Sequence, residues 1–263
     1  MIRDPHTSRF LPTEGIHNLR DYGGWTTPGG GRVKTGLLFR SGQHRDATDE
    51  DLQAFQALGV RTIIDLRGLT EREKFPCRRH EDFDAHIVAY DGETSNSPPH
   101  MGDGEPVTMT TQRAFDRMIA VYTRMPVNPA MIDMFGRYFE ALETQDGGSL
   151  VHCFAGKDRT GIAASLLLHV LGVHKDDVIA EFLRTNDALT KHILENQSLP
   201  RMREVYDGIE DGAIENLMNV RPEYIATYIS EVERDHGSID TYLAQSLGVD
   251  EARKARLRDR FVA

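Results

Sequence analysis

One short stretch of the chain gathers residue types that could do chemistry together. Residues 151–161 read VHCFAGKDRTG, and five residues separate Cys153 from Arg159. A strand pattern precedes the cysteine, a buried-helix pattern follows the arginine, and Gly156 between them permits unusual backbone angles. The alternative, an inert buried cysteine at a strand end, leaves the glycine, the arginine and Thr160 unexplained. The spacing therefore predicts a nucleophile on a tight loop directly ahead of a helix.

Such a loop suits a phosphoryl group. Backbone N–H groups that curl ahead of a helix N-terminus form a nest for an anion, and a guanidinium can add two hydrogen bonds to phosphate oxygens. The same positive field favours the thiolate form of Cys153, and Thr160 can donate a hydrogen bond to the sulfur. We therefore expect Cys153 to attack phosphorus and Arg159 to hold the phosphoryl group. The expected phosphate-binding residues are Phe154, Ala155, Gly156, Lys157, Asp158, Arg159 and Thr160.

Two other motifs do not fit the same letters. A nucleotide-binding loop of the form GxxxxGK[ST] would need glycine at Val151 and serine or threonine at Asp158. A metal site built on His152 and Cys153 is disfavoured, because neighbours on a strand point to opposite faces and no second His/Cys pair follows at ligand spacing. We therefore expect no metal and no cofactor, and we expect His152 to support the loop through a hydrogen bond. Cys77 has no arginine six positions further on and is expected to be structural.

The segment HCFAGKDRTG resembles the active-site signature of the cysteine-based tyrosine and dual-specificity phosphatases, and in particular their bacterial branch. Further segments share the resemblance: NLRDYGG at 18–24, LFRS at 38–41, ALGVR at 57–61, IDLR at 64–67 and FLRTN at 182–186. It implies a cysteine-phosphatase fold and hydrolysis of phosphomonoesters through a cysteinyl-phosphate intermediate. The substrates implied are phosphotyrosine and, more widely, phosphoserine/threonine and phosphoinositides, carried by a phosphorylated protein or a lipid headgroup.

The resemblance also implies roles for further residues. A general acid must protonate the leaving oxygen, and both Asp91, just after a predicted strand, and Asp158, inside the loop, are candidates between which the sequence does not choose. Lys157 is linked in the family to a second phosphate, such as that of an inositol lipid. Asp65 and Arg67 are expected to support the site. Two rival functions stay open: a catalytically idle phosphate-recognition module and, less favoured, a sulfurtransferase.

The elements that must position this loop follow from periodicity. Short β-rich runs predict strands at 36–40, 60–65, 85–90 and 149–152, and helical spacing predicts helices at 48–58, 160–171, 176–186, 191–206, 222–233 and 238–247, with another beginning near Thr111. Alternation of the two types indicates an α/β fold with a mainly parallel central sheet flanked by helices and a helix-rich C-terminal third. We expect residues 1–263 to form a single phosphatase-like domain, with residues 91–110 as a mobile loop or lid.

Composition excludes several classes of protein. The chain has 263 residues, and 31 Lys and Arg against 41 Asp and Glu give a net charge of −10, which disfavours nucleic acid as a partner. Only two cysteines, Cys77 and Cys153, argue for a reducing compartment and against a disulfide framework. The polar start and the lack of a long apolar run predict a cytoplasmic protein without stable membrane insertion, although export without a classical signal peptide stays open. The oligomeric state is left open.

Overall fold

The computed structural model describes residues 9–94, 108–189, 203, 206 and 208–263. A central five-stranded sheet has the order β1-β2-β5-β3-β4. Its strands are β1 Arg20–Asp21, β2 Leu38–Ser41, β3 Val60–Asp65, β4 His86–Ala89 and β5 Gly148–His152. β1 is antiparallel to β2, and every other neighbouring pair is parallel. The predicted mainly parallel sheet is confirmed, with β5 at its centre.

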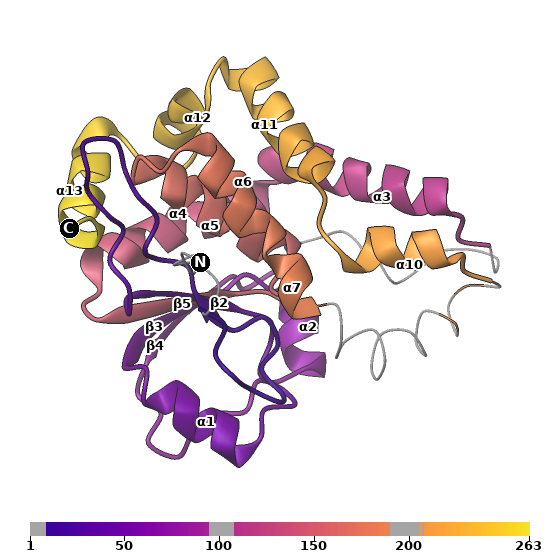
Figure 1. Ribbon diagram of the computed structural model, residues 1–263, viewed down its shortest axis with the longest axis horizontal. Helices are drawn as coiled ribbons and strands as arrows, with labels where there is room; N and C mark the ends of the chain where they lie inside the picture. Colours follow the sequence, from indigo (N-terminus) through magenta and orange to yellow (C-terminus); the bar gives the residue numbers. More distant parts are fainter. Residues whose placement is uncertain (1–8, 95–107, 190–202, 204–205, 207) are drawn as a thin grey trace, which may run out of the picture.

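Helices flank the sheet on both faces. α1 lies on one face, and α4, α5, α6 and the last three helices lie beyond the other (Figure 1). The helices are α1 Asp49–Gln56, α2 Leu69–Lys74, α3 Thr111–Arg124, a 3-10 turn Met125–Val127, α4 Pro129–Thr144, α5 Asp158–Val170, α6 Lys175–Leu183, α7 Thr185–Leu189, α10 Asp211–Met218, α11 Pro222–His236, α12 Ile239–Ser246 and α13 Glu251–Phe261. The C-terminal third is helix-rich, as predicted.

Alternate residues of the central strands face two different cores. Leu38, Ile64 and Val151 join the larger core with the helices of one face. Their neighbours in the chain, Phe39, Ile63 and Leu150, join a smaller core that Leu52 and Phe55 of α1 complete. Because side chains alternate along a strand, each strand contributes to both cores and is held in one register. This fixes where β5 ends, and therefore where the loop after it begins.

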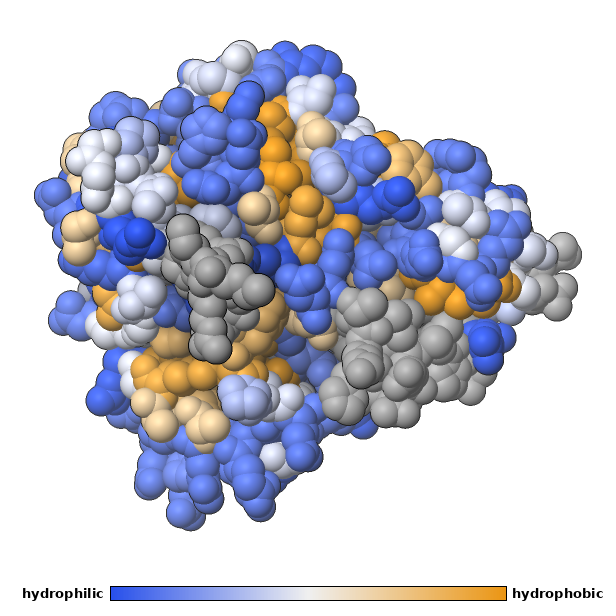
Figure 2. Space-filling view, in the orientation of Figure 1, coloured by the Kyte–Doolittle hydropathy of each residue, from blue (hydrophilic) through white to orange (hydrophobic). Residues whose placement is uncertain are grey.

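A capping box formed by Thr48 and Asp51 starts α1. The Asp51 amide donates to Thr48 Oγ1 over 3.1 Å, and the Thr48 amide donates back to Asp51 Oδ2 over 3.0 Å. Asp51 also accepts hydrogen bonds from the amides of Glu14 and Gly15 at 2.9 and 2.7 Å, so its carboxylate ties the N-terminal segment to α1. The outer side of α1 is hydrophilic, and apolar residues gather above it toward the sheet (Figure 2).

The central helix α5 is buried on nearly all sides, as the apolar run predicts, and begins two residues before the expected start. The helix expected over 176–186 is instead two helices, α6 and α7, which meet at Arg184. The helix predicted at 191–206 lies almost wholly outside the described residues, as does most of the loop or lid predicted at 91–110. No helix of the described part is long and apolar enough to cross a membrane.

Candidate active site

The centre of the site is the loop that joins β5 to α5. β5 ends directly before Cys153 and is paired on both sides, so the cysteine emerges at the carboxyl edge of the sheet, where parallel α/β folds bind ligands. Cys153 is 3% exposed. Gly156 has a φ of +67°, and a Cβ there would lie 2.4 Å from the Ser41 carbonyl group. Only glycine fits this position, which lets the chain turn sharply into α5.

Arg159 in the first turn of α5 is held by a carboxylate of α2. Its two terminal nitrogens donate to the two carboxylate oxygens of Glu71 over 2.6 and 2.9 Å, and Nη1 also donates to Thr94 Oγ1 over 3.1 Å. Burial alone would raise the pKa of Glu71, but the guanidinium outweighs it and holds that pKa below its usual range. The pair therefore stays ionised and fixes the guanidinium beside the loop.

Two further arginines lie fully buried beneath the loop. Arg40 of β2 and Asn18 donate hydrogen bonds to the carbonyl oxygen of Gly156 over 2.9 and 2.7 Å. Arg20 of β1 donates to Glu181 Oε1 over 2.8 Å and also contacts Asn18 Oδ1. These contacts connect the loop backbone to β1, β2 and α6, which lie far apart in the sequence.

The charges under the loop do not balance. Arg20 and Arg40 are both inaccessible to solvent, and Glu181 is the one carboxylate with which they form ion pairs among the described residues. Burial, with the repulsion from Arg40, lowers the pKa of Arg20 to about 9, and burial also lowers the pKa of Arg40, which Glu181 opposes. Because a guanidinium stays protonated in proteins, both side chains are charged at neutral pH. Arg20, Arg40 and Glu181 together therefore carry a net positive charge below the loop, which favours an anion there.

The structure separates the two candidate acids. Asp158 is the first residue of α5, its Oδ1 accepts a hydrogen bond from Tyr122 over 2.7 Å, and its Oδ2 lies 3.6 Å from Lys157 Nζ. Asp91 is exposed and follows β4, the edge strand, which is separated from β5 by β3. β4 and β5 are therefore two strand spacings apart, which corresponds to about 10 Å. The structure thus brings Cys153, Asp158 and Arg159 together and leaves Asp91 at the sheet edge.

Lys157 turns away from the open side of the loop. The side chain is 4% exposed, and its ammonium group donates to the backbone carbonyls of Leu217 and Asn219 over 2.5 and 3.4 Å. These two acceptors belong to the end of α10 and the residues that follow it. Lys157 therefore connects the loop after β5 to the α10–α11 connection, a contact that its expected role toward a second phosphate did not predict.

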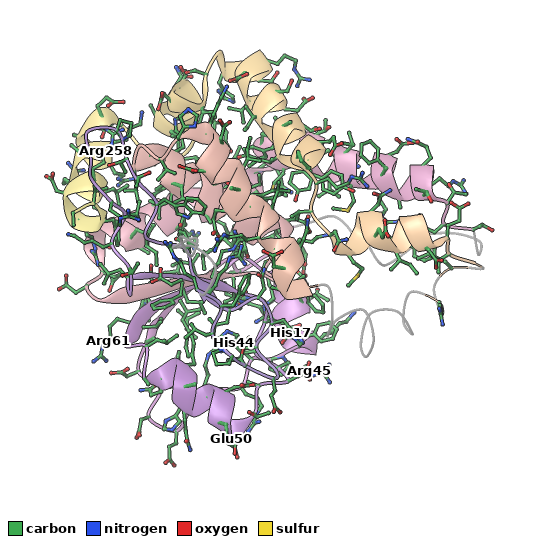
Figure 3. All side chains as sticks on the ribbon, viewed as in Figure 1. His17, His44, Arg45, Glu50, Arg61 and Arg258 are labelled. Atoms are coloured by element: carbon green, nitrogen blue, oxygen red, sulfur yellow. The ribbon has the colours of Figure 1, made fainter. Side chains whose placement is uncertain are left out.

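Behind the loop, His152 supports Cys153 through the predicted kind of hydrogen bond. Its Nδ1 lies 3.2 Å from the carbonyl oxygen of Cys153, and its ring stacks on His44, which Figure 3 shows between the sheet and α1. Burial lowers the pKa of His152 to about 4 although Asp65 opposes the shift, so the ring is neutral at pH 7.

Asp65 forms a two-pronged ion pair with Arg67, over 2.9 and 2.7 Å, as the supporting role predicts. Burial opposes ionisation of Asp65, but His152 and Arg67 outweigh it and lower its pKa to about 2.

Comparison with known proteins assigns the family. A family model described as the tyrosine phosphatase family matches residues 11–263. The chain belongs to this family. A relative named a tyrosine-protein phosphatase, from Cupriavidus necator, is 34% identical over 96% of this chain and 88% of its own length. The triple specificity protein phosphatase PtpB of Mycobacterium tuberculosis is 25% identical over 95% of this chain and 97% of its own.

Among solved structures, the human tyrosine phosphatase-like serine/threonine/tyrosine-interacting protein shows a distant likeness. The TM-score is 0.33 at 16% identity, covering 73% of this chain and 92% of that one. Membership of the tyrosine phosphatase family confirms the resemblance that the loop signature and the flanking segments carry, and it makes this chain a protein-tyrosine/dual-specificity phosphatase.

Some residues of this tyrosine phosphatase site differ from the sequence prediction or were missed by it. Thr160 Oγ1 is buried and has no hydrogen-bond partner within the described residues, so the expected bond to the sulfur is not formed. Glu71 and Tyr122 were not predicted, because nothing in their local pattern marks them as partners of the loop. Arg40 lies in the segment LFRS, which shares the family resemblance, but no local pattern indicates that its side chain contacts the loop.

Proposed function

We propose that this phosphatase works through a cysteinyl-phosphate intermediate. Cys153 Sγ forms a bond to phosphorus while the bond from phosphorus to the leaving oxygen breaks. In the second step a water attacks phosphorus, the sulfur–phosphorus bond breaks, and inorganic phosphate leaves. The observation that carries the proposal is the placement of Cys153 and the ion-paired Arg159 at opposite ends of one glycine-containing turn, above a buried positive charge.

Arg159 can hold the phosphoryl group without giving up Glu71. Glu71 occupies the edge of the guanidinium formed by its two terminal nitrogens. The other edge, formed by Nε and Nη2, can donate two parallel hydrogen bonds to phosphate oxygens. Glu71 therefore acts as a positioning residue, because it fixes the plane of the guanidinium before substrate arrives.

Asp158 is the acid that the geometry supports. Tyr122 donates to one of its oxygens, and the second oxygen accepts no hydrogen bond from the described residues and lies 3.6 Å from Lys157 Nζ, at the start of α5. In the first step Asp158 would give its proton to the leaving oxygen, and in the second step it would take a proton from the attacking water. Asp91 is the alternative that the resemblance implies, and it would need its segment to approach the loop.

The proposed substrates are phosphotyrosine residues of proteins, with phosphoserine/threonine and phosphoinositides as wider classes. The relative PtpB carries the name triple specificity phosphatase, and 25% identity along nearly the whole chain supports a similarly broad range. The case for inositides rests on Lys157, whose ammonium group already has two carbonyl partners. Phosphotyrosine is therefore the substrate class that we place first.

The decisive experiment compares wild type with Cys153→Ser and Cys77→Ser on an aryl phosphate. We expect Cys153→Ser to lose turnover while still binding phosphate, and Cys77→Ser to retain most turnover. Acid quenching during turnover should trap phosphate on Cys153, which mass spectrometry of the digested protein locates. Turnover by Cys153→Ser close to wild type would refute the covalent mechanism.

The two rival functions make different predictions in the same assays. A phosphate-recognition module would bind phosphate but show no turnover with any aryl phosphate. A sulfurtransferase would move sulfur from thiosulfate to cyanide and would trap a persulfide, rather than a phosphate, on Cys153. The carboxylate-held arginine favours hydrolysis of a phosphoester, because it supplies a fixed fork for phosphate oxygens.

A further inference from the structure

Three metal-ligating side chains meet behind the phosphate loop. Asp65 ends β3, His152 ends β5, and Cys77 lies in the segment between α2 and β4. Asp65, Cys77 and His152 each offer one ligand atom, and these three atoms all lie within 4.8 Å of one another. Asp65 Oδ2 and His152 Nε2 are 3.6 Å apart. Two ligands at about 2.1 Å from a tetrahedral zinc ion are separated by about 3.4 Å, so this pair already has suitable spacing.

The orientation of His152 is that of a metal ligand. A carbonyl oxygen can only accept, so the bond to Cys153 O places the ring proton on Nδ1. The second ring nitrogen, Nε2, can then offer a lone pair to a metal. This atom is fully buried and has no hydrogen-bond partner among the described residues, and Asp65 Oδ2 lies 3.6 Å from it. An Nδ1–H bound to a carbonyl, with Nε2 directed at a ligand set, is the usual arrangement of a metal-bound histidine.

The sulfur of Cys77 is a second atom of the cluster that can offer lone pairs to a metal. Arg67 Nη2 donates to Sγ over 3.1 Å, and the His44 amide donates over 3.3 Å. Two N–H groups directed at one sulfur show that it acts as an acceptor here, and a cysteine sulfur is a ligand that Zn²⁺ accepts. Cys77 is only half-buried, so an ion could reach the cluster from its side. Thiolate, imidazole and carboxylate together are ligands that Zn²⁺ accepts.

We propose that Asp65, Cys77 and His152 form a binding site for a thiophilic divalent cation such as Zn²⁺. The guanidinium of Arg67 now contacts both the carboxylate and the sulfur, and it supplies one positive charge beside two potential negative ones. A bound cation competes with Arg67 for these two atoms. The site is separate from the phosphate-binding residues and is not needed for the proposed chemistry. It adjoins Cys153 through His152, which precedes Cys153 in the chain and donates a hydrogen bond to its carbonyl oxygen.

The two cysteines of the chain make the site testable with cobalt as a spectroscopic probe. In Cys153→Ser, Cys77 is the one remaining thiol. Adding one equivalent of Co²⁺ to this reduced protein should produce a sulfur-to-cobalt charge-transfer band in the near ultraviolet, which Zn²⁺ should abolish. The double variant Cys153→Ser/Cys77→Ser should show no band. Competition with a chromophoric chelator should give a Zn²⁺ affinity that Cys77→Ser weakens by about tenfold or more.

Variants of the other two ligands separate a built site from a reactive thiol. In the Cys153→Ser background, Asp65→Asn and His152→Gln should each weaken Zn²⁺ binding, whereas replacing the exposed His174 with Gln should not. Absence of the band in Cys153→Ser would overturn the proposal. A band that is unchanged by both Asp65→Asn and His152→Gln would also overturn it, because Cys77 would then bind metal with other partners. If one of these two buried variants fails to fold, the other still shows whether the band depends on the cluster.

Discussion

Arg40 provides the strongest link between a single buried side chain and the reactivity of the loop. It donates to the Gly156 carbonyl and carries a charge that Glu181 must share with Arg20. We expect Arg40→Met to slow alkylation of Cys153 by iodoacetamide at mildly acidic pH and to lower kcat/KM for an aryl phosphate by about 10- to 100-fold, because a charge near the thiolate and the phosphoryl group is lost.

Two controls separate charge from folding in this experiment. Arg40→Lys keeps the charge and should retain part of the activity. Arg61→Met removes an exposed arginine on β3, labelled in Figure 3, and should leave alkylation unchanged. If Arg40→Met were folded and its cysteine reacted as fast as that of wild type, the buried charge would have no role in activating the loop.

Leaving-group dependence distinguishes the two candidate acids. A phenoxide that departs easily needs little protonation, whereas a poor leaving group needs a full proton transfer. We expect Asp158→Asn to slow aryl phosphates with poor leaving groups far more than activated ones, and Asp91→Asn to behave nearly as wild type. The measurement is the slope of log kcat/KM against the pKa of the leaving phenol. A steeper slope in Asp91→Asn alone would assign the acid to the segment after β4.

The contacts of Lys157 predict a structural effect rather than a substrate-specific one. Lys157→Met removes hydrogen bonds from an ammonium to two carbonyls and should lower the free energy of unfolding by about 1–3 kcal/mol. Activity on phosphotyrosine peptides and on multiply phosphorylated inositides should then fall by similar factors. A selective loss on inositides would instead support the role toward a second phosphate that the family resemblance implies.

At the level of elements, the start of α1 gives a stability prediction with a defined pH dependence. Burial of Asp51 opposes its ionisation, but the amides of Gly15, Thr48 and Glu14 outweigh burial and lower its pKa below the ordinary 3.8. The stabilising contribution is therefore fully present above about pH 4 and is lost as the pH falls through the lower folded-state value. Asp51→Asn should cost about 1–2 kcal/mol at pH 7 and progressively less in acid.

Denaturant unfolding at several pH values measures this difference. Glu50→Gln, in the same helical turn but exposed and labelled in Figure 3, is the matched control and should change stability little at any pH. A cost of Asp51→Asn that stays constant from pH 7 to pH 3 would mean that the carboxylate charge is not what stabilises α1.

Some helices and strands could be predicted closely from the sequence, whereas several contacts of the site could not. Strand β3, the capping box of α1 and the buried α5 follow from local periodicity and cap residues, so they could be predicted closely. The Glu71–Arg159 pair could not, because α2 has six residues and its partner lies 88 positions away. The break between α6 and α7 was likewise missed, since apolar spacing continues through Arg184. Contacts through space, rather than local pattern, decide these features.

Across the whole molecule, Glu181 joins segments that are far apart in the chain. It lies on α6 and pairs with Arg20 and Arg40, which precede it by 161 and 141 residues. The same contacts hold the loop backbone through Arg40 and Asn18. Stability and anion binding are therefore opposed here, because the excess positive charge of Arg20 and Arg40 over Glu181 destabilises the protein without phosphate and attracts phosphate.

This opposition yields a prediction for Glu181→Gln. Removing the carboxylate leaves two buried guanidiniums without a counter-ion, and should lower the free energy of unfolding by about 3–5 kcal/mol in phosphate-free buffer. Added phosphate should recover more stability in this variant than in wild type, because a bound anion neutralises more unpaired charge and ligand binding stabilises the folded state. Urea unfolding with and without saturating phosphate measures both quantities, with the exposed Glu233→Gln as control. An equal response to phosphate in Glu181→Gln and wild type would show that the buried charges do not act on the anion site.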